Sequence, residues 1–232
     1  MFRFCLFCAL CTFVAGLVGC QKGVMNDSSA NTSSDNVPAA KKVAMSAEDV
    51  DPVKTGDRAP SATLSRLDGT SVSLGELYAD KSLMMVFYRG GWCPYCNTHL
   101  MEVGQVEPEL TEMGFDVVAI SPDRPAKLNE SMEKGEFKYE LLSDADMSLS
   151  KAFGLAFRVD DATIGKYKDY GIDLEDASGH DHYLLPVPAV YIIDTKGTIQ
   201  FAHWNPDYKN RIDNEALLSA AREAKDTTTS AR

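Results

Sequence analysis

Two cysteines separated by two residues, Cys93 and Cys96, are the residues whose type and spacing most directly indicate chemistry in this sequence. The apolar run from Leu83 to Tyr88 predicts a buried strand. Two glycines interrupt this run, and a helical pattern begins at Cys93. A C-x-x-C pair carried by a strand, a tight loop and a helix is typical of a redox-active dithiol. We therefore predict that Cys93 and Cys96 are catalytic.

The predicted helix start would activate these thiols. If Cys93 is the N-cap, Pro94 occupies the first helical position, where its missing N–H costs nothing. Both sulfurs then face the positive end of the helix dipole, which lowers thiol pKa. Arg89 adds positive charge from upstream, unless it is a surface residue. Trp92 and Tyr95 either frame the dithiol or pack into the loop.

The sequence gives little support for a metal or cofactor site. A single C-x-x-C supplies two of the four ligands of structural zinc, and His99 is a possible third. No histidine follows Cys96 directly, which disfavours covalent haem. The cluster from His180 to His182 lies in a polar stretch and is more often solvated surface. We expect neither metal nor cofactor.

Composition indicates a folded, acidic protein. The chain has 232 residues, of which 44% are hydrophobic, enough to form a sizeable core. Its 34 acidic and 23 basic residues give a formal net charge of −11. Because phosphate binding requires a basic surface, a nucleic-acid partner is not expected.

The first residues form a targeting segment. Arg3 precedes an apolar run from Phe4 to Val18, shorter than the roughly 20 residues of a membrane span. The run ends in Leu17 to Cys20, which resembles a bacterial lipobox and implies a signal peptide over 1–19 and a lipidated Cys20. An ordinary secretory signal and an uncleaved anchor are the alternatives. Gln21 favours the outer over the inner membrane if the cell is Gram-negative.

A signal of this kind simplifies the cysteine count. Three cysteines leave with the signal and Cys20 carries the lipid, so Cys93 and Cys96 remain as the free thiols of the mature protein. Residues 20–50 are rich in Ser, Asn, Asp and Ala and show no hydrophobic period, which predicts a flexible tether. The tether would hold the domain near the membrane of the cell envelope, facing the periplasm.

Residues 51–224 form the predicted domain, with a polar tail over 225–232. The segment 159–184 is charged and aromatic, and we expect it to be an irregular insertion covering the active face. A break or kink is expected at Pro108 inside the helix that starts at Cys93. Alternating strands and helices predict an α/β fold with a mixed central β-sheet flanked by helices. The expected strands are 62–65, 71–74, 83–88, 116–121, 139–144, 190–194 and 198–202; the expected helices after the one at Cys93 are 125–134, 148–153 and 214–224, with one helical turn at 74–78.

Seven short motifs occur in an order that resembles the peroxiredoxin-like branch of the AhpC/TSA family, within the thioredoxin fold. The resemblance spans about residues 56–222 and implies a thioredoxin-like fold. The motifs are Gly56–Pro60, Leu67–Gly69, Phe87–Cys96, Ala119–Asp123, Leu142–Asp144, Val187–Asp194 and Asn205–Tyr208.

The sequence departs from the family at its active centre. Peroxiredoxins share a Pro-x-x-x-Thr-x-x-Cys motif, and the cysteine of this motif attacks peroxide. In that register Cys96 takes the peroxidatic position, Cys93 replaces the threonine and Arg89 replaces the proline. The family's later arginine falls at Pro188. By resemblance to thioredoxin-like folds, Pro188 would be a cis-proline beside Cys93; an ordinary trans proline is the alternative.

Two functions follow from the resemblance and the dithiol. In a thiol-dependent peroxidase, Cys96 attacks hydrogen peroxide or an organic hydroperoxide and Cys93 resolves the sulfenic acid. In a thiol–disulfide oxidoreductase, Cys93 attacks the disulfide of an exported protein and Cys96 resolves the mixed disulfide. We favour the peroxidase. A lipid-anchored binding domain without enzymatic activity is a third hypothesis. Both enzymes require a thiol electron donor outside the cytoplasm.

Overall fold

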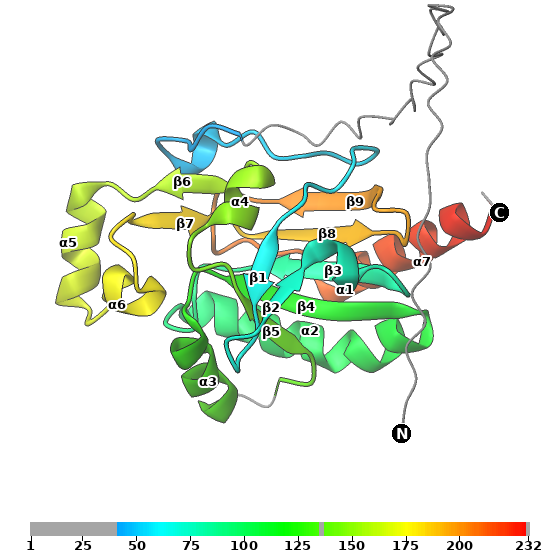
Figure 1. The fold of residues 1–232 in the computed structure, drawn as a ribbon, viewed down its shortest axis with the longest axis horizontal. Coiled ribbons are helices and arrows are strands. Elements are labelled where there is room, and N and C mark those ends of the chain that lie inside the picture. The colour runs from blue at the N-terminus through cyan, green and yellow to red at the C-terminus, as the bar shows by residue number, and fades with distance from the viewer. Residues whose placement is uncertain (1–40, 135–136, 231–232) are drawn as a thin grey trace, which may run out of the picture. The chain divides into compact units, whose positions relative to one another are not determined.

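A computed structural model describes residues 41–134 and 137–230 (Figure 1). The predicted signal peptide, Cys20 and most of the predicted tether lie outside the described residues. Within the described chain, a seven-stranded sheet has the order β2-β1-β5-β4-β3-β8-β9. Strands β3, β4 and β5 run parallel to one another, and the other neighbouring pairs are antiparallel. The prediction of an α/β fold with a mixed central sheet is confirmed.

The helices and strands that the sequence predicts follow one another in the expected order, and the described residues add two α-helices, one short 3-10 helix and two short strands. In chain order they are a short 3-10 helix η1 (Ala47–Asp49), β1 (Thr63–Ser65), β2 (Ser71–Ser73), α1 (Leu74–Leu77), β3 (Ser82–Phe87), α2 (Pro94–Glu112), β4 (Phe115–Ser121), α3 (Pro125–Lys134), β5 (Glu140–Ser143), α4 (Ser148–Ala152), β6 (Ala156–Arg158), α5 (Asp161–Asp169), α6 (Leu174–Ser178), β7 (Leu184–Pro186), β8 (Ala189–Ile193), β9 (Ile199–Trp204) and α7 (Asn214–Ser230).

Strand β3 is the centre of the core because both of its faces are buried. Met84 and Val86 point to the face covered by α2 and α7. Leu83, Met85 and Phe87 point to the opposite face, where they pack with α4 and its neighbours. A continuous apolar run is what a strand buried on two faces requires. The strand ends at Phe87 and therefore delivers the following loop and its cysteines to the edge of a rigid core.

Of the kink or break expected at Pro108, the break is wrong. Helix α2 continues through Pro108 to Glu112. Val103 and Leu110, on either side of the proline, are fully buried in the core. Glu109 also pairs with Arg222 of α7 at 2.8 Å. Packing on both sides of the proline therefore holds the helix together where one backbone hydrogen bond is missing.

The segment 159–184 is also more regular than expected. It contains helices α5 and α6, and its ends are joined by antiparallel pairing of β6 with β7. The two helices lie side by side beyond these strands in Figure 1. They share a small separate core formed by Val159, Ile164, Leu174 and Leu185.

Local capping explains why hydrophobic periodicity did not reveal these helices. The side chain of Asp160 accepts a hydrogen bond from the Thr163 N–H at 2.9 Å and begins α5. Asp173 accepts from the N–H groups of the second and third residues after it and begins α6. Aspartate caps of this kind stabilise helix starts in short, charged segments.

Regular structure is found on both sides of the predicted domain range, 51–224. Ala44 pairs with β6: its N–H donates to the Ala156 carbonyl, and its carbonyl accepts from the Arg158 N–H, each at 3.0 Å. Helix α7 continues to Ser230. In the ranges 41–134 and 137–230, no helix is both long enough and apolar enough to cross a membrane.

We predict that replacing Leu185 with Ala destabilises α5 and α6 selectively. Leu185 is 1% exposed in their shared core, and a buried Leu→Ala change costs about 2–5 kcal/mol. Hydrogen exchange should accelerate in α5 and α6 and stay unchanged in β3. Tyr170→Ala, at a site that is 77% exposed, is the matched control and should change neither. Equal acceleration in β3 would show that these helices do not open separately.

Candidate active site

Cys93 and Cys96 occupy the start of α2, as predicted. Cys93 is the N-cap residue and Pro94 the first helical residue. The Cys93 N–H donates to the Gly90 carbonyl at 3.1 Å, closing a tight turn in which Gly90 has φ of +144°. Both cysteines are free thiols and almost fully buried. The two sulfurs therefore share a shielded site at a helix N-terminus.

The two thiols differ in acidity. A hydrogen bond from Cys96 lowers the pKa of Cys93; burial opposes this, and the charges of Arg89 and Arg211 assist it. Burial raises the pKa of Cys96, as does its interaction with Cys93, while Arg211 partly offsets the change. The arrangement thus favours a Cys93 thiolate stabilised by a protonated Cys96.

Arg211 was not predicted from the sequence. Its Nη2 donates to Cys96 Sγ at 3.3 Å across 115 positions of sequence. It lies in the segment between β9 and α7, where no hydrophobic pattern predicts its direction. The motif Asn205–Tyr208, just upstream, was the available signal that this segment belongs to the site. Arg211 therefore brings a positive charge to the dithiol, although Pro188 occupies the position where the family resemblance places an arginine.

Arg89 is buried rather than a surface residue, since it is only 4% exposed. Its guanidinium lies 4.0 Å from the ring centroid of Tyr208, 5.1 Å from that of Trp92 and 5.6 Å from that of Tyr167. Its Nη2 also donates a hydrogen bond to the Tyr167 hydroxyl. Aromatic faces attract such a cation electrostatically. Arg89 is thereby held where its charge lowers the pKa of Cys93.

Aromatic side chains from three segments surround this arginine. Trp92 packs on Tyr167 of α5, with centroids 5.5 Å apart, and Tyr95 packs on Tyr208 at 5.6 Å. Tyr95 is also 47% exposed. Helix α5 therefore reaches the active centre through Tyr167, as expected for an insertion covering the active face.

The expected cis-proline at Pro188 is wrong, because no cis peptide bond occurs in the described chain. Pro188 directly precedes β8, and its carbonyl accepts a hydrogen bond from the Asn205 N–H at 3.2 Å. This contact extends the β8–β9 pairing by one step, so a trans proline fits the strand start. Pro188 still lines a cavity together with Arg89, Tyr167 and Tyr208.

The histidines considered as ligands have other surroundings. His99 is buried, and burial together with the Arg211 charge lowers its pKa to about 4, which keeps it neutral. His182 interacts with the Ala145 carbonyl at 2.9 Å and accepts from the Leu184 N–H at 3.0 Å. Among the described residues, no cluster of three or more His, Cys, Asp or Glu side chains is placed to hold a metal ion.

We predict that Arg211→Met raises the pKa of both thiols, because it removes a cation that favours the two thiolates. The first thiolate to appear as pH rises, that of Cys93, should appear at higher pH than in the unchanged protein, closer to the ordinary cysteine value of about 8.5. Arg222→Met removes an exposed arginine of α7 and serves as the control. An unchanged titration in Arg211→Met would show that Arg211 does not stabilise the thiolate.

Comparison with known proteins finds one family. The profile of the AhpC/TSA family matches residues 55–202. A putative peroxiredoxin of Haemophilus influenzae is 34% identical over 106 residues, which are 46% of this chain and 68% of the relative. A putative peroxiredoxin of Mycobacterium tuberculosis is 28% identical over 150 residues, 65% of this chain and 84% of the relative.

Solved structures support the fold. Prx3 of Vibrio vulnificus superposes with a TM-score of 0.60 at 22% identity, covering 73% of this chain and 99% of that one. The thioredoxin-like peroxiredoxin fold predicted from the motifs is therefore confirmed. With more than half of the sequence matched by the family profile, the chain belongs to the AhpC/TSA family.

Proposed function

We propose that this protein is a thiol-dependent peroxidase that reduces hydrogen peroxide or organic hydroperoxides through a Cys93–Cys96 dithiol and disulfide cycle. The observation that carries this proposal is a buried dithiol at the start of α2, with Arg211 Nη2 at 3.3 Å from Cys96 Sγ and the charges of Arg89 and Arg211 favouring the Cys93 thiolate. Membership of the AhpC/TSA family, with relatives named as putative peroxiredoxins, supports the same activity.

The acidity of the thiols supports an order of events opposite to that implied by the family register. The Cys93 thiolate attacks the peroxide and becomes a sulfenic acid, and an alcohol or water leaves. The Cys96 thiol then attacks the Cys93 sulfur, releasing water and forming the disulfide. An external thiol donor restores the dithiol by exchange.

A second candidate function uses the same nucleophile. The low pKa of Cys93 at the first position of a C-P-Y-C motif also suits attack on a protein disulfide. In that reaction Cys96 would release the reduced partner. The two functions differ in the first substrate rather than in the attacking residue.

Single-cysteine variants treated with equimolar peroxide separate these possibilities. Cys96→Ser should consume peroxide and accumulate a trappable sulfenic acid at Cys93, because the resolving thiol is missing. Cys93→Ser should react at least about a hundredfold more slowly, since the remaining thiol is protonated. A sulfenic acid at Cys96 in Cys93→Ser would instead restore the family order. Absence of peroxide consumption by the unchanged protein, with a trapped mixed disulfide at Cys93 of Cys96→Ser, would favour disulfide exchange.

We further propose that Cys20 is lipidated and that the domain faces the periplasm from the cell envelope, where its thiol donor must also act. The support is the sequence Leu17 to Cys20 at the end of an apolar segment. In a Gram-negative host, the full chain should partition with membranes and incorporate labelled fatty acid. Cys20→Ser should lose the label, and retention of the label would contradict lipidation at this residue.

A further inference from the structure

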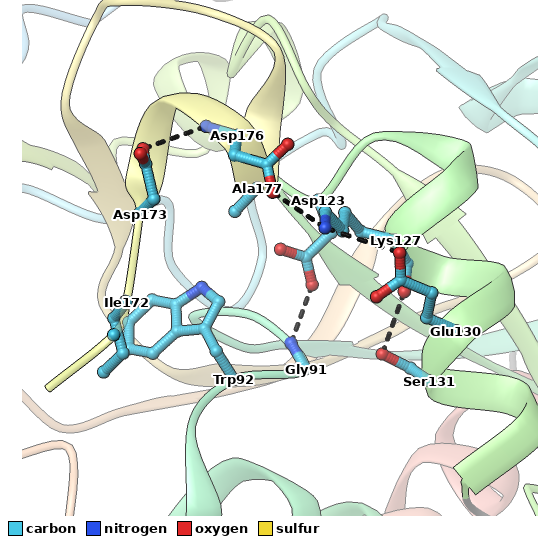
Figure 2. Close-up of a pocket in the computed structure, with 11 residues that line it drawn as sticks. Gly91, Trp92, Asp123, Lys127, Glu130, Ser131, Ile172, Asp173, Asp176 and Ala177 are labelled. Carbon is cyan, nitrogen blue, oxygen red and sulfur yellow. Dashed lines mark hydrogen bonds and ion pairs between the residues drawn. The ribbon is translucent and has the colours of Figure 1, made fainter. Parts of the chain in front are cut away.

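A buried carboxyl group, Asp123, lies beside the loop that precedes the dithiol. Asp123 follows the end of β4 and is 2% exposed. Its Oδ2 accepts a hydrogen bond from the Gly91 N–H at 2.7 Å (Figure 2). Gly91 stands two residues before Cys93, so this bond fixes the carboxyl group against the active-site loop.

The other oxygen of the Asp123 carboxyl group and the indole N–H of Trp92 make no hydrogen bond within the described part of the chain. Neither Asp123 Oδ1 nor Trp92 Nε1 has a hydrogen-bond partner among the residues that the structure describes, although both atoms are buried. Figure 2 shows the indole nitrogen and this oxygen facing one another within the pocket. Buried polar atoms without partners are costly, and an oxygen atom bound between these two would give both of them a hydrogen bond.

Both atoms reach the same small volume beside Gly90. A Cβ on Gly90 would lie 2.3 Å from Trp92 Nε1 and 2.9 Å from Asp123 Oδ1. Since both atoms lie within 3 Å of one point, they are close enough to each other for a single oxygen atom placed between them to hydrogen-bond to both. Any residue other than glycine at position 90 would occupy the space, and its φ of +144° also favours glycine.

The surroundings allow Asp123 to carry a proton near neutral pH. Burial raises its pKa to about 6; the Gly91 N–H, Ser121 and the charge of Lys127 act in the opposite direction, and Cys93 raises it further. Lys127 is itself engaged with Asp176 at 2.8 Å and Glu130 at 3.4 Å. The remaining acidic group of the pocket, Asp173, caps α6.

We propose that Asp123 is the proton donor to the oxygen that leaves when Cys93 reduces a hydroperoxide, and that the Trp92 N–H donates a second hydrogen bond to that oxygen. This inference rests on the proposed peroxidase function. It assigns a catalytic role to a residue that is no part of the dithiol or its arginines.

The step balances in atoms and electrons. The Cys93 thiolate forms a bond to the hydroxyl-bearing oxygen of the peroxide, and the O–O bond breaks. The sulfur supplies both electrons and becomes a sulfenic acid. The leaving alkoxide takes the proton of Asp123 and departs as an alcohol, or as water when the substrate is hydrogen peroxide. Asp123 regains a proton from solvent through the pocket or from the next Cys93 thiol as it ionises.

The test compares two peroxides in Asp123→Asn, whose amide oxygen still accepts from the Gly91 N–H but which has no acidic proton. tert-Butyl hydroperoxide leaves as a strongly basic alkoxide, whereas peracetic acid leaves as acetate, which needs no proton. The single-turnover rate with tert-butyl hydroperoxide should fall about a hundredfold, a typical effect of losing a general acid. The rate with peracetic acid should stay within about threefold of the unchanged protein, because no general acid is required.

Two controls separate chemistry from folding. Glu130→Gln makes the same carboxyl-to-amide change at the rim of the pocket and should react normally with both peroxides. Alkylation of Cys93 by iodoacetamide, whose iodide leaves without a proton, should be at least as fast in Asp123→Asn as in the unchanged protein.

Each remaining outcome contradicts a stated part of the proposal. An equal loss with both peroxides and with iodoacetamide would mean that Asp123 only shapes the loop. An undiminished rate with tert-butyl hydroperoxide would mean that Asp123 is not the donor. An unchanged protein that is alkylated normally at Cys93 but consumes neither peroxide would overturn the proposed function itself, and the role of Asp123 with it.

Discussion

The burial of the Arg89 guanidinium beside the Cys93 thiol is the interaction on which the active centre depends. Removing a charge from water costs on the order of several kcal/mol in a protein interior. The attraction between a cation and a single aromatic ring offsets only about 0.5–2 kcal/mol of this cost. Three rings, the Tyr167 hydroxyl and a neighbouring thiolate together can offset a penalty that no one of them could.

Segments that are distant in sequence meet around the Arg89 guanidinium and the dithiol. Helix α5 supplies Tyr167, and the segment after β9 supplies both Tyr208 and Arg211. The β3–α2 connection supplies Arg89, Trp92 and the two cysteines on a turn tightened at Gly90. The sheet fixes the start of that connection, because β3 is buried on both faces. Cys93 therefore follows a strand that is buried on both faces, while the aromatic and charged side chains near it come from loops and a short helix.

Sequence reasoning was most successful where the signal was local. The apolar run of β3, the hairpin of β1 and β2, and the N-cap role of Cys93 each depend on adjacent residues, and the structure agrees with all three. Arg211 and Asp123 were not identified, because their importance comes from contacts with residues far along the chain. The α5–α6 segment was interpreted as irregular because aspartate caps, rather than hydrophobic spacing, begin its helices.

The buried Arg89 and the half-buried Arg211 also bear on the redox potential of the dithiol. Cations that stabilise the Cys93 thiolate favour the reduced protein, whereas the disulfide carries no charge for them to stabilise. A dithiol whose reduced form is stabilised has a higher reduction potential. In the proposed cycle, the two arginines therefore shift the equilibrium of a Cys93–Cys96 disulfide toward the reduced dithiol.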